Sequence, residues 1–143
     1  MSIDAIAIIP ARLASTRLPR KILREILGKT MLERVYTAAS ACPLLREVIV
    51  ATDADEIASV CRNHNWRVEM TSTDHRSGTD RVHEVAQRLL ASRSATAETV
   101  FVNVQGDEPL ARPEHIDALL RPMADGNHQI STIWTPCSAE DVA

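Results

Sequence analysis

The sequence predicts an α/β protein whose mainly parallel sheet is covered by helices on both faces. Short apolar runs, suited to strands buried on both sides, alternate along the chain with longer segments of helical period. Connections of this length between parallel strands are right-handed crossovers, which place the helices over the sheet. Because no repeat, low-complexity tract or linker interrupts the alternation, we expect a single domain over residues 1–143.

The first half of the chain is predicted to hold three strands and two helices. The strands are Ala5–Ile9, which Pro10 ends, then Glu47–Thr52 and the shorter Arg67–Thr71. The helices run from Thr30 to Ala41 and from about Ala54 to Asn63. Their apolar stripes are Leu32, Val35, Tyr36 and Ala39 in the first and Ile57, Val60 and Cys61 in the second.

The second half continues the alternation. Thr79–Leu90 is an amphipathic helix, with Val82, Val85, Ala86 and Leu89 as its stripe. Thr99–Val104 is a buried strand, and Pro113–Arg121 is a helix with proline in its first turn. Ile130–Trp134 is predicted to start one more strand.

Composition excludes several classes of protein. A hydrophobic fraction of 45% and a charged fraction of 24% are those of an ordinary globular domain, and a net charge of −3 argues against a general nucleic-acid partner. No apolar run reaches membrane-spanning length and no signal peptide is recognisable, so we expect a cytoplasmic protein without membrane insertion. Cys42, Cys61 and Cys137 lack metal-ligand or redox spacing, which indicates reduced, structural thiols.

Basic residues gather in one segment of this mildly acidic chain. Seven of them stand against two glutamates between positions 12 and 34: Arg12, Arg17, Arg20, Lys21, Arg24, Lys29 and Arg34. Such a local excess of positive charge favours a focused anion site over a broad polyanion surface.

Ligands of open α/β sheets bind at the carboxyl ends of the strands. The loops to search are therefore residues 10–27, 53–56, 72–81 and 105–112. In the first, the small residues Ala14, Ser15 and Thr16 allow backbone N–H groups to approach an anion. Arg12, Arg17 and Lys21 can then neutralise phosphate oxygens, although a solvated basic loop has the same composition.

Two familiar phosphate-binding motifs are missing. Gly28-Lys29-Thr30 resembles the end of a Walker A loop, but Leu23 stands where its first glycine is required. We expect these three residues to open the following helix instead. No Gly-x-Gly-x-x-Gly occurs anywhere in the chain.

The loop over residues 71–81 permits two interpretations, a binding segment or a plain helix cap. Ser77 or Thr79 can cap the helix that follows, and Gly78 allows a turn that a side chain would block. His75 is interpreted as a polar loop residue, because nothing in the sequence pairs it with a nucleophile.

The segment over residues 104–109 also leaves two interpretations open. Gly106 permits close backbone approach, and Asp107 stands where one carboxylate can share Mg²⁺ with phosphate oxygens. The alternative is a turn in which Asp107 bonds its own backbone.

Taken together, these segments resemble the 3-deoxy-manno-octulosonate cytidylyltransferases, also called CMP-Kdo synthetases. The matching stretches, in the order and spacing of that family, are residues 8–19 (IIPARLASTRLP) with Lys21, residues 51–53 (ATD), residues 77–81 (SGTDR) and residues 102–109 (VNVQGDEP). The likeness covers nearly the whole chain. Pro-Ala-Arg alone is shared with cytidylyltransferases for sialic acid, whereas the last two stretches are more specific.

The resemblance implies a three-layer nucleotide-diphospho-sugar transferase (Rossmann-like) fold and the reaction of CTP with Kdo to CMP-Kdo and pyrophosphate, a step toward lipopolysaccharide. It implies that Arg12, Arg17 and Lys21 hold the triphosphate and that Asp107 binds the cofactor Mg²⁺. It places around the nucleotide and sugar the residues Ala11, Ser15, Ser77, Gly78, Arg81 and Gln105.

The chain departs from the family in two ways. Arg20-Lys21-Ile22 stands where the family has Gly-Lys-Pro, so that Arg20 either adds an anion contact or blocks the turn. Members of the family are also longer, and the remaining part is expected to carry a second metal-binding aspartate, sugar-recognition residues and the interface of a homodimer. Alternative functions are a cytidylyltransferase for another acid sugar and an inactive, truncated nucleotide-binding module.

Overall fold

The computed structural model describes residues 3–15, 17–134 and 136–137. Its main sheet has four parallel strands in the order β5-β4-β1-β6. These are β1 (Ala5–Ala11), β4 (Glu47–Thr52), β5 (Arg67–Met70) and β6 (Val100–Asn103). The predicted parallel sheet is therefore confirmed, with β1 two residues longer than expected because the strand continues through Pro10.

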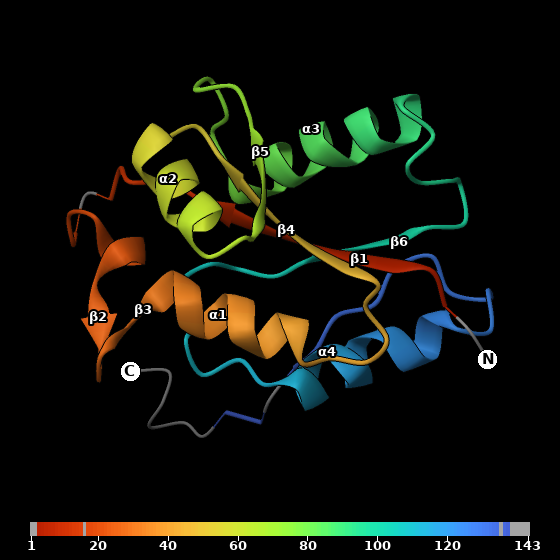
Figure 1. The fold of residues 1–143 in the computed structure, drawn as a ribbon. Helices are drawn as coiled ribbons and strands as arrows, with labels where there is room; N and C mark the ends of the chain where they lie inside the picture. Colours follow the sequence, from red (N-terminus) through yellow and green to blue (C-terminus); the bar gives the residue numbers. More distant parts are fainter. Residues whose placement is uncertain (1–2, 16, 135, 138–143) are drawn as a thin grey trace.

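Helices cover both faces of this sheet, as predicted (Figure 1). On one face, α1 (Met31–Ser40), α2 (Asp55–Asn63) and α4 (Pro113–Leu120) share one hydrophobic core with the odd-numbered residues of β1. On the other face, α3 (Gly78–Ala91) packs against Ile6 and Ile8. Successive strand residues point to opposite faces, so a continuous apolar run supplies both cores at once.

The helices begin where side chains satisfy free backbone N–H groups. Thr30 accepts a hydrogen bond from the Glu33 N–H at 3.1 Å and caps α1. Ser77, rather than Thr79, caps α3 and forms a reciprocal capping box with Asp80. Pro113 stands in the first turn of α4. Proline lacks a backbone N–H, and at this position no hydrogen bond within the helix is lost.

The apolar stripes were predicted with small errors. In α2, Ala58 is buried and Val60 is only half-buried, so the buried face is formed by Ile57, Ala58 and Cys61. The helix α4 ends at Leu120, one residue early, and the 3-10 turn η2 (Arg121–Met123) follows.

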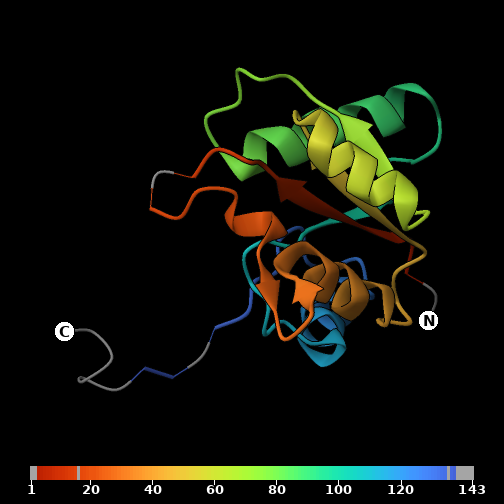
Figure 2. The same cartoon turned by 60° about the vertical axis from the view of Figure 1, so that its left-hand side comes forward.

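The strand predicted at Ile130–Trp134 is wrong. These residues pair with no other strand, and Ile130 and Trp134 are 86% and 83% exposed. Figure 2 shows the described part of this segment leading away from the sheet. An apolar pattern identifies a candidate strand, but a strand needs a neighbour to accept its backbone hydrogen bonds.

A small hairpin between β1 and α1 was not predicted. It pairs β2 (Glu25–Ile26) with β3 (Lys29–Thr30) through a turn in which Leu27 and Gly28 both have positive φ. A 3-10 turn, η1 (Lys21–Leu23), precedes the hairpin. Gly28-Lys29-Thr30 thus completes a hairpin and caps a helix, in agreement with the rejection of a Walker A loop.

Candidate functional site

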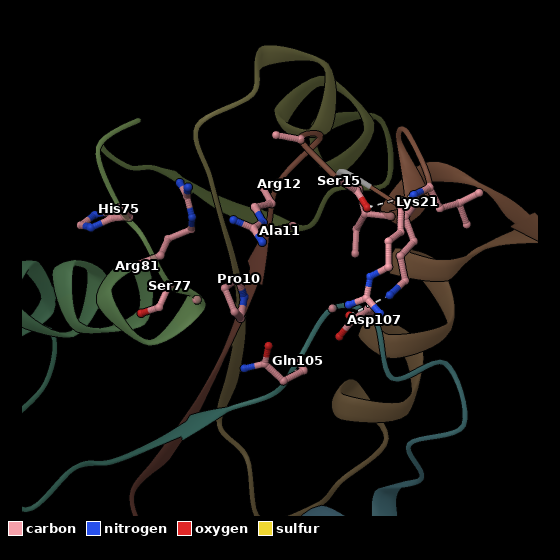
Figure 3. Close-up of a pocket in the computed structure, with 16 residues that line it drawn as sticks. Pro10, Ala11, Arg12, Ser15, Lys21, His75, Ser77, Arg81, Gln105 and Asp107 are labelled. Carbon is pink, nitrogen blue, oxygen red and sulfur yellow. Dashed lines mark hydrogen bonds and ion pairs between the residues drawn. The ribbon is translucent and has the colours of Figure 1, made fainter. Parts of the chain in front are cut away.

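A cavity of about 780 Å³ lies at the carboxyl ends of β1 and β6. Three loops line it: the one that follows β1, the one before α3, and the one that follows β6 (Figure 3). The structure brings all of the sequence-predicted site residues to this cavity, namely Ala11, Arg12, Ser15, Arg17, Lys21, Ser77, Gly78, Arg81, Gln105 and Asp107. Segments up to 96 residues apart in sequence therefore share one site, as the topology of a parallel sheet requires.

The loop after β1 supplies most of the positive charge. Arg12 and Arg17 are exposed at the cavity and form no ion pair with a described residue. Ser15 Oγ accepts a hydrogen bond of 3.4 Å from the Leu18 N–H, which curves the loop back toward η1. Thr16, predicted to belong to this loop's anion nest, lies outside the described residues.

The seven basic residues of this region divide into two groups. Arg12, Arg17 and Lys21 line the cavity. The others do not, and two of them bond to backbone carbonyls: Arg24 to Pro19 and Arg34 to Ile26. Part of the predicted basic cluster therefore lines the cavity, and part of it bonds to the backbone or lies elsewhere.

Arg20 takes neither of the two roles considered for it. Its backbone is left-handed, with φ of 57°, which is the conformation that glycine adopts most readily. Its side chain does not line the cavity but forms an ion pair with Glu56 of α2. The turn is therefore formed despite the bulky residue.

Lys21 and Asp107 meet across the cavity. The Lys21 Nζ atom lies 2.9 Å from Asp107 Oδ2, which joins the loop after β1 to the loop after β6. Among the described contacts, Asp107 forms no hydrogen bond to its own backbone, which disfavours the turn-forming interpretation of this residue.

Arg81 is the most deeply buried charge at the site, with 4% of its side chain exposed. Its guanidinium donates to Asp53 Oδ2 at 2.9 Å and to the Thr71 hydroxyl, with a longer contact of 3.4 Å to the Ser72 carbonyl. These bonds satisfy much of its hydrogen-bonding capacity, since a guanidinium has five N–H groups. Arg81 therefore fixes the loop before α3 as well as facing the cavity.

The two glycines of the site are explained by packing rather than by a turn. A Cβ on Gly78 would lie 3.1 Å from Pro10 Cγ, so a side chain would be crowded there as predicted, although Gly78 has no positive φ and the reason is packing. A Cβ on Gly106 would lie 2.7 Å from Ile22 Cδ1 and 3.0 Å from the Pro10 carbonyl oxygen. Both glycines let the three loops approach one another closely.

Gln105 is oriented by its neighbour. Its Nε2 donates to Asn103 Oδ1 at 2.8 Å, and its Oε1 would lie 3.6 Å from a Cβ on Gly78. The side chain therefore extends from the end of β6 toward the start of α3, and it lies below Pro10 in Figure 3.

Sequence reasoning missed His75, which lines the cavity and contacts Glu84 through Nε2 at 2.5 Å. The pKa of Glu84 is lowered, first by this hydrogen bond and then by one from the Ser72 N–H. The sequence showed this histidine within the predicted loop, but its partner Glu84 lies nine residues away on a helix.

Among the residues that the structure describes, Asp107 is the one carboxylate that lines the cavity. The described residues contain no group of three or more acidic, histidine or cysteine side chains that could enclose a metal. One carboxylate beside a cationic loop fits Mg²⁺, which keeps several waters and is often shared with phosphate oxygens. Within the described part of the chain, no helix is long and apolar enough to cross a membrane.

The fold and the cavity define an α/β protein with a cationic site at the carboxyl edge of a parallel sheet. The profile of the cytidylyltransferase family matches residues 6–142, and the chain belongs to that family.

Named relatives and a solved structure agree. The chain is 61% identical to a 3-deoxy-manno-octulosonate cytidylyltransferase of Koribacter versatilis, over 99% of this chain and 52% of that protein. It is 45% identical to a 3-deoxy-manno-octulosonate cytidylyltransferase of Acidobacterium capsulatum, over 99% of this chain and 55% of that protein. A CMP:2-keto-3-deoxy-manno-octonic acid synthetase complexed with CTP superposes with a TM-score of 0.76 at 39% identity, over 85% of this chain and 47% of that one. The chain thus spans about half the length of these relatives.

Proposed function

We propose that this chain is the nucleotide-binding half of an enzyme that forms CMP-Kdo and pyrophosphate from CTP and 3-deoxy-manno-octulosonate. The observation that carries the proposal is that three cationic side chains line one cavity together with the loops that hold Ser77 and Asp107. These side chains are Arg12, Arg17 and Lys21. The relatives named for this reaction, and the similar synthetase complexed with CTP, support the same substrates. The proposal extends to a cytoplasmic location, a homodimer of the full-length protein and a role in lipopolysaccharide synthesis.

The proposed chemistry is in-line substitution at the α-phosphorus. A hydroxyl oxygen of the sugar forms the new bond to the α-phosphorus and loses its proton to solvent. The bond between the α-phosphorus and the oxygen that joins it to the β-phosphorus breaks, and pyrophosphate leaves with that oxygen. Negative charge develops on the leaving and non-bridging oxygens, and fixed positive charges stabilise it without reorganising. Arg12, Arg17 and Lys21 are placed to supply those charges.

The cofactor in this proposal is Mg²⁺, with Asp107 as its ligand from this chain. When bound beside the phosphates, Mg²⁺ supplies additional positive charge and lowers the pKa of a coordinated hydroxyl. The role of Lys21 is then to bind phosphate, which requires it to exchange its contact with Asp107 for one with the nucleotide.

The test is pyrophosphate release from CTP with a panel of acid sugars: Kdo, its amino-substituted form and sialic acid. Release with Kdo alone supports the proposal, whereas release with another sugar identifies a related cytidylyltransferase. CTP binding measured by calorimetry without release from any sugar identifies a binding module. Absence of CTP binding in the presence of Mg²⁺ overturns all of these functions.

A further inference from the structure

The carboxylate of Glu84 in α3 gathers three donors. It accepts from the Ser72 N–H at 3.0 Å and from His75 Nε2 at 2.5 Å, and its other oxygen pairs with Arg88. Two of the donors belong to the segment between β5 and α3, residues 71–77, here called the α3 loop. Glu84 therefore ties the middle of this loop to the helix that follows it.

The α3 loop has few other anchors. His75 is half-buried, whereas the other residues between positions 72 and 77 are exposed. An exposed loop is fixed mainly by its polar ties, and each tie restricts several backbone angles. The contact between His75 and Glu84 is the one that holds the loop at its centre.

The loop contributes His75 and Ser77 to the lining of the cavity. At its start, Thr71 accepts a hydrogen bond from Arg81, which also lines the cavity, and at its end Ser77 caps α3. Figure 3 shows the His75 ring at the edge of the cavity opposite Lys21, turned outward from Arg12. His75 thus faces its helix rather than the centre of the site, which suits a residue that positions others.

We propose that His75 and Glu84 are positioning residues that hold the α3 loop as one wall of the nucleotide cavity. The statement that the wall serves a nucleotide rests on the proposed function. A carboxylate only accepts hydrogen bonds, so the hydrogen is on His75 Nε2 and the tautomer is fixed. The partly buried carboxylate is charged at neutral pH, which strengthens both loop contacts.

The contact through Nε2 makes a sharp comparison of conservative variants possible. The amide nitrogen of glutamine lies close to the position of Nε2, whereas that of asparagine lies close to Nδ1. His75→Gln therefore retains a donor to Glu84, and His75→Asn does not. Glu84→Gln changes the other partner of the contact and removes the negative charge that accepts the hydrogen bond. His83→Gln is the matched control, since His83 is an exposed histidine of α3 whose ring bonds to Gln87 and not to Glu84 among the described hydrogen bonds.

Two measurements on the 143-residue chain test the proposal, after circular dichroism has shown that each variant is folded. The first is hydrogen exchange of the loop amides without nucleotide, in which His75→Asn and Glu84→Gln are expected to speed exchange at Ser72 about tenfold. The second is calorimetric affinity for CTP with Mg²⁺, expected to fall about tenfold in the same two variants. His75→Gln and the His83 control are expected to retain near-wild-type values.

Equal exchange in all variants overturns the positioning role, as does equal impairment by glutamine and asparagine at position 75. Faster loop exchange with unchanged CTP affinity also overturns it, because the loop would then be no wall of the nucleotide site. If the wild-type chain fails to bind CTP, the proposed function is wrong, and the exchange experiment still decides whether His75 and Glu84 hold the loop.

Discussion

The Lys21 ammonium lies 2.9 Å from the Asp107 carboxylate, and this ion pair joins the loops that follow β1 and β6. Both side chains are partly exposed, so the pair is exchangeable rather than structural. A triphosphate would attract Lys21 and a divalent cation would attract Asp107. The two residues therefore have partners of opposite charge available within one substrate complex.

Removal of a cavity cation is expected to weaken CTP binding. Arg17→Ala and Lys21→Ala should each lower the affinity about tenfold or more, since each removes a charged hydrogen bond to phosphate. The loss should shrink as salt is added, because salt screens exposed charges. Lys29→Ala is the control, an exposed lysine of the same basic segment outside the cavity. Calorimetry measures the CTP affinity of each variant at two salt concentrations. An unchanged affinity in a variant would show that the replaced residue does not bind CTP.

Loss of the carboxylate should separate nucleotide binding from the metal. Asp107→Asn is expected to abolish the Mg²⁺ dependence of CTP affinity while freeing Lys21 for phosphate. In EDTA the variant should therefore bind CTP at least as tightly as the wild type does. Glu108→Gln is the control, because Glu108 is the exposed neighbour that does not line the cavity. Persisting Mg²⁺ dependence in Asp107→Asn would remove this residue as the ligand.

The left-handed backbone of Arg20 has a measurable cost. Glycine relieves about 1–2 kcal/mol of steric strain at such a position but is less restricted when unfolded. On a Glu56→Gln background, which already lacks the ion pair, Arg20→Gly should raise the free energy of unfolding by about 0.5–1 kcal/mol. Urea denaturation measures this difference. A decrease would show that the arginine side chain stabilises the turn in another way.

The three thiols should react at different rates. Cys42 and Cys61 are buried and Cys137 is exposed, and burial raises the pKa of Cys61 to about 11. Iodoacetamide at pH 8 should therefore label Cys137 first, since the thiolate is the reactive form and must be accessible. Mass spectrometry of the digested protein identifies the site, and labelling in denaturant should reach all three. Rapid labelling of Cys61 in the folded protein would contradict the described core.

Asp4 should contribute to acid sensitivity. Its pKa is lowered, first by the hydrogen bond from Thr99 and also by Arg46. A carboxyl with a lower pKa in the folded state adds stability above its unfolded pKa of about 3.8, and that stability is lost as the pH falls through the folded value. Asp4→Asn should thus lower the free energy of unfolding at pH 7 and flatten its fall below about pH 4. Denaturation at several pH values tests this, and parallel curves for both proteins would exclude the effect.

Much of the fold could be predicted from the spacing of apolar residues along the sequence. Ala5–Ala11 and Glu47–Thr52 form strands because continuous apolar runs suit positions buried on both faces. Ile130–Trp134 (ISTIW) is rich in strand-forming residues but pairs with no strand in the described part of the chain, because side-chain type does not specify a partner. The hairpin at Glu25–Thr30 was missed because each of its strands has only two residues, too few to show a period.

The sequence by itself determined the parallel α/β class, the loops that bear the site and, through matching stretches, the residues around the cavity. Those features follow from local periods and short motifs. Only the tertiary structure decided that Arg20 turns outward to Glu56, that Gly78 is required by Pro10, and that Lys21 meets Asp107. The same is true of His75 and Glu84. In each case the deciding contact joins different loops or elements, and such contacts exist only once the sheet has brought its carboxyl ends together.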